Sequence, residues 1–295
     1  MFRKKYLWAV IYSVILTAFT TYALLDTFVI KKVEAEVVDN LGESPELDPD
    51  EIQITENSYR DNNISITITE YYEYDTAIYV ADIKLSSPNL LKTALAENAY
   101  GRNVTEKTSE IAERVGAILS INGDFYGARE QGYVIRNGVL YRDDGGRNRE
   151  DLVIYEDGSF GIINESDISA KELLDNGAAQ VLSFGPALIE NNEMVVDRNS
   201  AVDKELASNP RCAIGIIDEG HYIFMVSDGR TNESEGLSLY EMAQFMTSLG
   251  VETAYNLDGG GSATMVFNGK VINKPTSNGK TFKERSVSDI VCIGY

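Results

Sequence analysis

The order of apolar and polar positions divides the chain into an uncharged run, a polar segment and a long region of short alternating patterns. Residues 6–25 carry no charged side chain, and twenty residues is about the length that an α-helix needs to cross a bilayer. Arg3, Lys4 and Lys5 precede this run, so the N-terminus should stay in the cytoplasm and the rest of the chain outside. We therefore expect a single-pass cell-membrane protein with an extracellular C-terminal domain. A cleaved signal peptide is the alternative, although its apolar region is usually only about 7–15 residues long.

A polar segment follows the apolar run. Residues 33–57 are rich in acidic side chains, contain Pro45 and Pro49, and show no sustained periodicity. Such a composition cannot bury enough apolar surface to fold. The pattern predicts a membrane anchor over residues 1–30, a disordered acidic stalk over residues 31–60 and one folded domain over residues 61–295.

Alternation at a period of two dominates the remaining residues. Ile64, Ile66 and Ile68 alternate with polar residues and predict a strand, because successive side chains of a strand point to opposite faces. Further strands are predicted at 77–85, 117–121 and 286–293, and hairpins at 133–141, 152–163, 211–226 and 263–272. Short helices are predicted at 89–98, 108–115, 170–176 and 238–249, with a turn at 101–103. Many hairpins and few helices predict an α+β fold with a mixed, largely antiparallel sheet and a few flanking helices.

The most informative stretch is residues 255–262, Tyr-Asn-Leu-Asp-Gly-Gly-Gly-Ser. Ser238 and Glu241 form a capping box, Gly250 ends the predicted helix, and a strand should follow over residues 251–257. Three glycines at the end of a strand allow a ligand to approach the backbone closely, and their N–H groups can form a concave anion site. The alternative is a tight connection without a ligand. The polar neighbours of the glycines favour a ligand; they are Asn256, Asp258 and Ser262.

Charge restricts the partners of this chain. The 295 residues carry a formal net charge of −20, and without the charged residues of the first 32 positions 21 basic and 45 acidic side chains remain, a net charge of −24. Such a surface repels nucleic acid at long range, so no nucleic-acid partner is expected. An anionic substrate must therefore be held by a local basic site. Among the turn and scaffold residues before position 117, only Arg102 stands out as more than scaffold.

The chemically versatile residues are few. His221 is the single histidine and lies at a predicted turn, which argues against a Ser-His-Asp triad and against a zinc site. Cys212 and Cys292 lie in strand-like surroundings and could pair outside the cell or remain two buried thiols. Carboxylate, guanidinium and amide chemistry remains. Candidate residues stand at predicted strand ends, where each alone is more often a turn residue; they are Asn122, Asp124, Arg211, Asp228, Arg230, Asn256 and Asp258. Glu284 and Arg285 form a further pair.

Seven stretches of the chain together carry a family resemblance. They are Asn-Gly-Asp-Phe-Tyr at 122–126, Phe-Gly-Pro at 184–186, Pro-Arg-Cys-Ala-Ile-Gly at 210–215, Asp-Gly-Arg at 228–230, Gly-Leu-Ser-Leu-Tyr-Glu at 236–241, Asn-Leu-Asp-Gly-Gly-Gly-Ser at 256–262 and Glu-Arg-Ser-Val at 284–287. Together they resemble the phosphodiester glycosidase family, the bacterial relatives of N-acetylglucosamine-1-phosphodiester α-N-acetylglucosaminidase. Many bacterial members are labelled exopolysaccharide biosynthesis proteins. The resemblance covers about residues 117–295, in family order, with an earlier match at 91–103. Two positions depart from it: Cys212 replaces a small hydroxyl residue, and Asp124 stands where many members carry glycine.

The resemblance implies hydrolysis of the glycosidic bond of a sugar-1-phosphodiester in a cell-envelope or extracellular glycan. A carboxylate must then serve the anomeric carbon, with Asp258 as first choice, Asp124 as second and Glu284 as a further candidate. Phosphate-binding donors are expected from Arg211, Arg230 and the amides of Gly259, Gly260 and Gly261, because the guanidinium fork matches phosphate. Asn122 and Asn256 would hold sugar hydroxyls. The remaining expected substrate-binding residues are Asp228, Ser262 and Arg285.

Two other classes of function stay open. A metal-dependent phosphodiesterase would cleave the phosphorus–oxygen bond, and a non-catalytic anchored module would bind envelope glycans without turnover. The sequence requires no cofactor, but the oxygen ligands allow a divalent cation. The expected partners are a sugar-phosphodiester or cell-wall glycan and the membrane.

Overall fold

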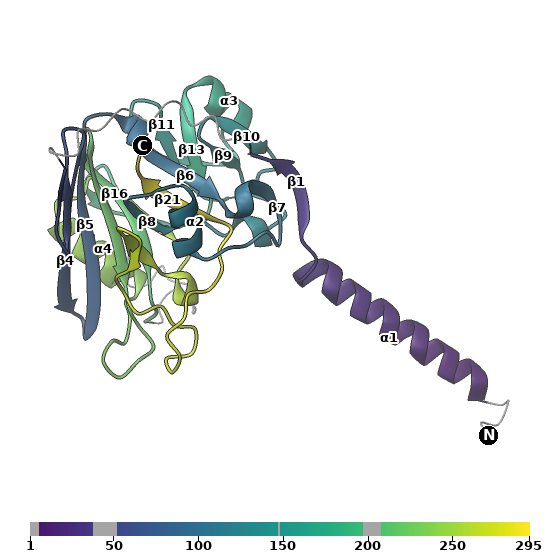
Figure 1. The fold of residues 1–295 in the computed structure, drawn as a ribbon. Coiled ribbons are helices and arrows are strands. Elements are labelled where there is room, and N and C mark those ends of the chain that lie inside the picture. Colours follow the sequence, from purple (N-terminus) through teal and green to yellow (C-terminus); the bar gives the residue numbers. More distant parts are fainter. Residues whose placement is uncertain (1–5, 38–51, 147, 197–207) are drawn as a thin grey trace.

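The computed structural model describes residues 6–37, 52–146, 148–196 and 208–295. Figure 1 shows a body of packed sheets and short helices from which one long N-terminal helix extends. Every strand pairing within these residues is antiparallel. The expectation of an α+β fold with a largely antiparallel sheet is therefore confirmed.

The largest sheet has nine strands and carries the stretch at residues 253–257 as the third strand from one edge. Its two longest strands, β4 and β5, pair along their whole lengths and lie at one side of the body (Figure 1). The strands in spatial order are β15 (Glu193–Met194), β14 (Ala187–Glu190), β18 (Thr253–Leu257), β16 (Cys212–Asp218), β17 (His221–Ser227), β5 (Thr76–Leu85), β4 (Ile64–Glu73), β3 (Ser58–Arg60) and β2 (Gln53–Ile54).

Two five-stranded sheets face the large one. The first has the order β20 (Lys270–Val271), β19 (Met265–Phe267), β8 (Leu119–Asn122), β21 (Asp289–Ile293) and β6 (Leu91–Leu95). The second has the order β10 (Val139–Arg142), β9 (Val134–Arg136), β13 (Ala178–Leu182), β11 (Glu150–Tyr155) and β12 (Phe160–Asn164). A two-stranded ribbon of β1 (Lys32–Glu36) and β7 (Ala99–Arg102) lies on the side of α1 (Leu7–Phe28).

The main core lies between the nine-stranded sheet and the two smaller sheets. Phe224 of the large sheet packs in one cluster with Ile121 and Leu152 from the two facing sheets. Burying an aliphatic or aromatic side chain of this size contributes about 1.5–3 kcal/mol, so this interface supplies much of the stability. Short helices cover the outer faces: α4 (Leu239–Ser248) on the large sheet, and α2 (Thr108–Arg114) and α3 (Ala170–Asp175) on the smaller ones.

Local sequence chemistry explains why the elements begin and end where they do. The side chain of Ser238 accepts a hydrogen bond from the Glu241 amide, and that of Glu241 accepts one from Ser238, which completes the predicted capping box of α4. Asn268 and Gly269 both have positive φ, as a two-residue hairpin turn between β19 and β20 requires. The predicted hairpins and the alternation of β4 are likewise confirmed.

Three predicted segments differ in the structure. Residues 89–98 form strand β6 between two 3₁₀ turns instead of a helix, because Leu91, Thr93 and Leu95 are buried while the backbone pairs with β21. Residues 99–102 extend as β7, so the turn begins only at Asn103, which has a φ of 58°. The prediction of a disordered stalk over residues 31–60 is wrong at both ends. There β1 pairs with β7, and β2 and β3 extend the large sheet; residues 38–51 lie outside the described residues.

Two further expectations concern single residue types. Cys212 and Cys292 are free and buried, so the alternative of two buried thiols is confirmed. His221 lies at the start of β17, where its Nε2 is 3.0 Å from an oxygen of Asp82, far along the hairpin from the residues at the other strand ends.

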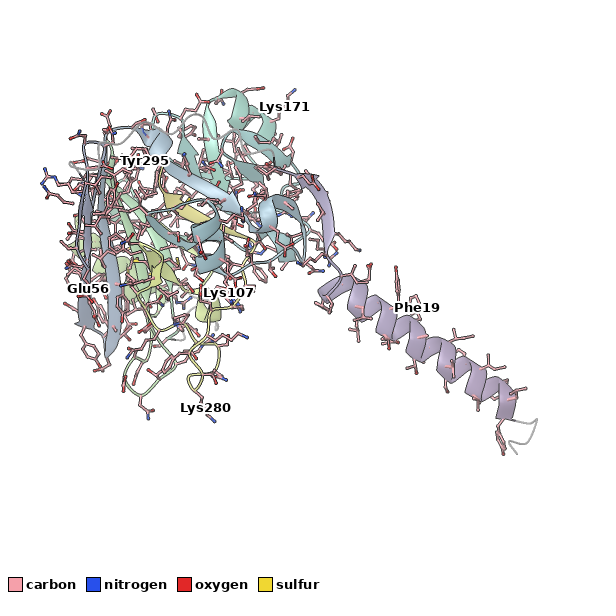
Figure 2. All side chains as sticks on the ribbon, in the orientation of Figure 1. Phe19, Glu56, Lys107, Lys171, Lys280 and Tyr295 are labelled. Carbon is pink, nitrogen blue, oxygen red and sulfur yellow. The ribbon has the colours of Figure 1, made fainter. Side chains whose placement is uncertain are left out.

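The long helix α1 packs against nothing over most of its length. None of its residues is buried, and Figure 2 shows its side chains, Phe19 among them, on a helix that extends away from the body. Its length and hydropathy would allow it to cross a membrane, and a signal sequence would meet the same two criteria.

Candidate active site

Two strand ends from different sheets meet at the glycine-rich stretch. The Asn122 side chain at the end of β8 donates from Nδ2 to the carbonyl of Asp258, at 2.6 Å, and accepts from the amide of Thr264 at 3.1 Å. The amide of Asp258 in turn donates to the carbonyl of Gly123, at 3.3 Å. Asn122 was predicted to hold a sugar hydroxyl, but its polar atoms already join the two sheets and position Asp258.

Asp258 forms an ion pair with Arg285 in which only the arginine is substantially exposed; we call it the half-open pair. Its Oδ2 is 3.0 Å from Nη2 of Arg285, whose Nε donates to Oγ of Ser262 at 2.7 Å. The side chain of Asp258 is 11% exposed, whereas that of Arg285 is 46% exposed. Asp258, Ser262 and Arg285 are therefore brought together as expected, in a pair that solvent and ligands can reach.

The protonation of Asp258 reflects opposing influences. Burial raises the pKa of its carboxyl above the ordinary value, whereas the Ser262 hydroxyl, the Arg285 charge and the Gly259 amide lower it. A carboxylate with this balance can accept a proton and can attack an electrophilic carbon, which are the two tasks that a glycosidase asks of it.

The glycines are required mainly by close packing. Gly260 has a φ of +62° and donates its N–H to the carbonyl of Pro210 at 2.7 Å, while a Cβ on Gly259 would lie 2.8 Å from the same oxygen. The amides of Ser262 and Ala263 are bonded within the turn, at 3.2 and 3.3 Å. A Cβ on Gly261 would overlap Ser277. The N–H of Gly260 is therefore engaged within the protein, whereas phosphate binding by the amides of Gly259 and Gly261 stays a prediction.

The two predicted phosphate arginines lie differently. The guanidinium of Arg230 is held by Asn209 Oδ1 and by the carbonyl of Ser277, and its Nη2 is 2.9 Å from where a Cβ of Gly260 would stand. Arg211 is buried, and its Nε donates to the carbonyl of Leu237 at 2.8 Å. The structure thus brings Arg230 to the glycines and directs the Nε of Arg211 towards the entry of α4.

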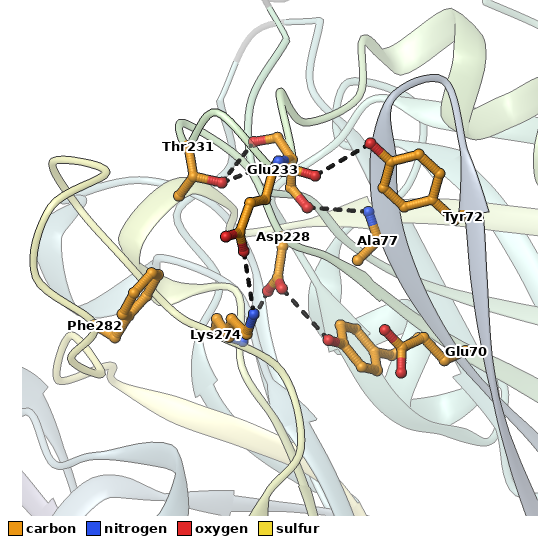
Figure 3. Close-up of a pocket in the computed structure, with 10 residues that line it drawn as sticks. Glu70, Tyr72, Ala77, Asp228, Thr231, Glu233, Lys274 and Phe282 are labelled. Carbon is orange, nitrogen blue, oxygen red and sulfur yellow. Dashed lines mark hydrogen bonds and ion pairs between the residues drawn. The ribbon is translucent and has the colours of Figure 1, made fainter.

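Asn256 and Asp228 have different surroundings. Asn256 donates from Nδ2 to the carbonyl of Gly185 at 2.6 Å, and its buried Oδ1 accepts no hydrogen bond from any described residue. Asp228 faces a different hollow, of about 170 Å³, which Figure 3 shows between β4 and the segment around Lys274. Its carboxylate accepts from the Lys274 amide at 2.8 Å and from Tyr79, and burial raises the pKa of its carboxyl.

Asp124 belongs to a buried ionic triad. Its Oδ2 is 2.9 Å from Nη2 of Arg136 and accepts the Ser183 amide, while Oδ1 accepts the Tyr126 amide. The same Arg136 nitrogen lies 2.7 Å from Asp289, and all three side chains are at most 2% exposed. Both oxygens of Asp124 are therefore engaged inside the protein, and the geometry favours Asp258 over Asp124 as the reacting carboxylate.

Glu284 has a positioning contact. Its two oxygens accept hydrogen bonds from the amide and the hydroxyl of Ser109, at 3.0 and 2.6 Å, in the first turn of α2. This contact fixes the residue that precedes Arg285. Both carboxylate oxygens of Glu284 are therefore engaged with Ser109, and this contact anchors the segment that carries Arg285.

Sequence reasoning missed Arg129, whose charge interacts with that of Asp258, and its neighbour Arg149. The guanidinium of Arg129 stacks 5.1 Å from the Phe184 ring and donates to the carbonyl of Ser183 at 2.8 Å. Arg149 donates to the carbonyl of Gln131 at 3.0 Å. Burial and the charge of Arg149 lower the pKa of Arg129, and the charges of Asp124 and Asp258 oppose this. Only the resemblance of residues 122–126 could have pointed to Arg129, since neither arginine has a local signature.

Metal ligation was left open by the sequence. In the part of the chain that the structure describes, no group of three or more His, Cys, Asp or Glu side chains is placed to hold a metal ion.

Comparisons with known proteins agree with this arrangement. The SPbeta prophage-derived uncharacterized protein YomE of Bacillus subtilis (strain 168) is 30% identical over 203 residues, 66% of this chain and 31% of that protein. The N-acetylglucosamine-1-phosphodiester alpha-N-acetylglucosaminidases of Mus musculus and Homo sapiens are 32% and 29% identical over 62% and 66% of this chain. Their matched parts are 39% and 40% of their own lengths, so the chain spans only about a third to two fifths of these relatives.

Solved structures share the fold. The catalytic domain of zebrafish N-acetylglucosamine-1-phosphodiester alpha-N-acetylglucosaminidase, auto-inhibited by its pro-peptide, superposes with a TM-score of 0.62 at 21% identity, over 90% of this chain and 88% of that one. A hypothetical protein from Synechocystis gives 0.61 at 16% identity, over 79% and 62%. The family model described as phosphodiester glycosidase matches residues 115–294, which include both strand ends and the glycine-rich stretch. The chain therefore belongs to the phosphodiester glycosidase family.

Proposed function

We propose that this protein hydrolyses the glycosidic bond of a sugar-1-phosphodiester, of the GlcNAc-1-phosphodiester type, in a cell-envelope or extracellular glycan. One observation carries the proposal. Within the matched family segment, Asp258 directly follows β18. Its carboxylate is paired with a half-exposed arginine and is still open to a ligand. The mammalian relatives, whose names state this activity, support the choice of substrate class.

The reaction divides into two tasks. Asp258 serves the anomeric carbon, either as nucleophile or as the base that takes a proton from water. The bond between the anomeric carbon and the phosphate oxygen breaks, its electron pair leaves with the phosphomonoester, and the hydroxyl of water ends on the sugar. Because a phosphate is already a weak base, it needs positioned donors more than a general acid. Before this step, Arg285 holds the Asp258 carboxylate in place and favours its ionised form.

The products of the reaction test this proposal. The purified full chain is incubated with a GlcNAc-1-phosphodiester in ¹⁸O-labelled water, and both products are identified. We expect free sugar that carries the label, together with an unlabelled phosphomonoester. Sugar-1-phosphate would instead indicate a metal-dependent phosphodiesterase, and binding without any product would indicate a glycan-binding module; either result would overturn the proposal.

The location of the protein is a second part of the proposal. At a rise of about 1.5 Å per residue, the 22 residues of α1 would span roughly 33 Å, enough for a bilayer core of about 30 Å. We therefore expect the domain to be held at the outer surface of the cell membrane. Membrane fractionation with N-terminal sequencing decides the point, since a released protein that starts near Val33 would show a cleaved signal.

A further inference from the structure

A second hollow opens beside the proposed site, and its walls are basic. It has a volume of about 480 Å³ and is lined by three arginines, Arg102, Arg129 and Arg149, together with Glu130 and Asp144. We call it the arginine hollow. Three guanidinium groups around one cavity are unusual in a chain whose formal net charge is −20.

The positive charge of the hollow is only partly balanced. Arg102 forms an ion pair with Glu130 at 2.8 Å, in which the carboxylate is largely exposed. Within the described residues neither Arg129 nor Arg149 forms an ion pair, and both donate to neutral oxygens of Ser183 and Gln131. The nearby Glu165 carboxylate already accepts from Tyr133, Gly146 and Ser183. Two neighbouring guanidinium groups that lack a carboxylate partner repel each other, and this repulsion has a free-energy cost. A bound anion would lower that cost.

The position of Arg149 is built into the backbone. Gly132 has a φ of +110°, and a Cβ there would lie 2.5 Å from Nη1 of Arg149 and 2.7 Å from Oγ of Ser183. The absence of a side chain at Gly132 lets this guanidinium lie against the main chain. The arginine is therefore held by the fold, in contrast to a surface arginine that samples many rotamers.

The hollow borders the Asp258 site. Arg129 lies between the rings of Phe184 and Phe125, with its guanidinium carbon 5.1 and 5.9 Å from their centres. Phe125 is two residues from Gly123, whose carbonyl accepts the amide of Asp258. The charge of Asp258 is also among those that act on Arg129.

We propose that the arginine hollow binds the phosphate group of the substrate, so that the sugar reaches Asp258 while Arg129 and Arg149 hold the leaving group. This inference rests on the proposed function for its choice of substrate. The planar forks of two arginines suit the oxygens of a phosphate, and their charge would stabilise the phosphomonoester as it leaves. This proposal places the phosphate site at Arg129 and Arg149, in place of Arg211 and Arg230, which the sequence suggested.

The contact between α1 and the body bears on where that phosphate could come from. Asn103, next to Arg102, donates from Nδ2 to the carbonyls of Thr27 and Ile30, at 3.2 and 3.0 Å. The amide of Asn103 donates to the carbonyl of Gly127, just before Arg129 along the chain. With α1 in a bilayer, the hollow would open near the membrane surface. A phosphate on a membrane lipid and one on a water-soluble glycan both have the required chemistry.

Phosphate binding by the full chain tests the inference without turnover. Calorimetry with inorganic phosphate is performed on the wild type and on Arg129→Gln, Arg149→Gln and Arg60→Gln, the last as a matched change at an exposed position of β3. A charge-assisted hydrogen bond corresponds to about a tenfold change in affinity or more. We expect at least that loss for Arg129→Gln and Arg149→Gln, and wild-type affinity for Arg60→Gln. Unchanged affinity in Arg149→Gln, or no binding by the wild type at millimolar phosphate, would overturn the inference.

Kinetics separate the two phosphate sources and the two proposals. Both variants are assayed in vesicles with a soluble GlcNAc-1-phosphodiester and with the same head group on a lipid. A KM raised with either substrate supports the hollow, and a KM raised with only one of them identifies the source of the phosphate. An unchanged KM with both substrates contradicts the inference. If the wild type binds phosphate but releases no sugar, the proposed function fails while the hollow stands. If Arg129→Gln does not fold, Arg149→Gln decides, because its backbone contact can be kept by glutamine.

Discussion

The protein contains two carboxylate–arginine groups of similar chemistry, placed in opposite surroundings. In the buried triad, Arg136 lies between Asp124 and Asp289, and the three side chains are almost fully enclosed. In the half-open pair, Arg285 holds Asp258 but remains 46% exposed. The triad sets one guanidinium against two carboxylates inside the protein, where burial raises the pKa of the Asp289 carboxyl, and its contacts fix the junction of β8, β9 and β21. The open pair leaves room for a ligand at a carboxylate, so it suits chemistry.

The largest difference between the two groups should be in stability. Replacing Arg136 by Met would leave two buried carboxylates without their counter-charge, and breaking such a group destabilises a protein by about 3–5 kcal/mol. Arg285→Met is the matched change at the open pair and should cost less, about 1–2 kcal/mol, because Arg285 is half exposed although Asp258 is largely buried. Urea unfolding of both variants measures the two free energies, and equal losses would remove the distinction drawn here.

The next effect concerns activity at the open pair. Arg285→Lys keeps the charge but cannot reproduce the joint contact with Asp258 and Ser262 that Nη2 and Nε make. We expect kcat/KM to fall about 10- to 100-fold, a loss of one or two charge-assisted hydrogen bonds, while the midpoint of unfolding stays near that of the wild type. A lysine variant as active as the wild type would show that Arg285 does not orient the carboxylate.

Asp151 is a third carboxylate, buried without an arginine partner. Its replacement should have the smallest effect, and that effect should depend on pH. Both oxygens of Asp151 lack a hydrogen-bond partner among the described residues, and burial with the charge of Glu165 raises its pKa to about 9. Between the ordinary carboxyl pKa of about 4 and 9, the folded state holds a proton that the unfolded chain releases. The contribution of Asp151 to the free energy of unfolding is therefore fully present below pH 4, and it is lost as the pH rises towards 9.

Asp151→Asn should remove that pH dependence. At pH 8 the variant should be more stable than the wild type by about 1–3 kcal/mol, because its neutral amide never has to be protonated. The two proteins should become similar towards pH 4. Urea unfolding at pH 5 and pH 8 measures the difference, and parallel slopes in wild type and variant would show that Asp151 is ionised in the folded protein.

The contrast between the two ionic groups also shows where sequence reasoning succeeds. Local chemistry was sufficient for the Ser238–Glu241 cap, the Asn268–Gly269 turn and the alternation of β4, because each depends on residues close in the chain. Residues 89–98 were assigned wrongly because their leucine and alanine spacing fits a helix, whereas pairing with the distant β21 makes them a strand. Tertiary pairing overrides propensity in such cases.

The residues of the candidate site also fall into those that the sequence predicts and those that it does not. Asp258 and Arg285 were expected from motifs, and the structure brings them together. Asp124 also follows a strand, and nothing in its local sequence reveals that Arg136 and Ser183 would occupy its oxygens. Arg129 and Arg149 were not predicted, because the role of an arginine depends on its contacts with residues from other strands, which the local sequence does not show.

The substitution Asp258→Asn tests the central claim most directly. It keeps the size of the side chain and removes the charge, so the purified full chain should still fold and bind substrate. We expect the release of sugar from a GlcNAc-1-phosphodiester to fall at least as far as the loss of a general base would cause, about 10²–10⁴-fold. An Asp258→Asn protein with an intact fold and a near wild-type rate would contradict the account and remove Asp258 from the mechanism.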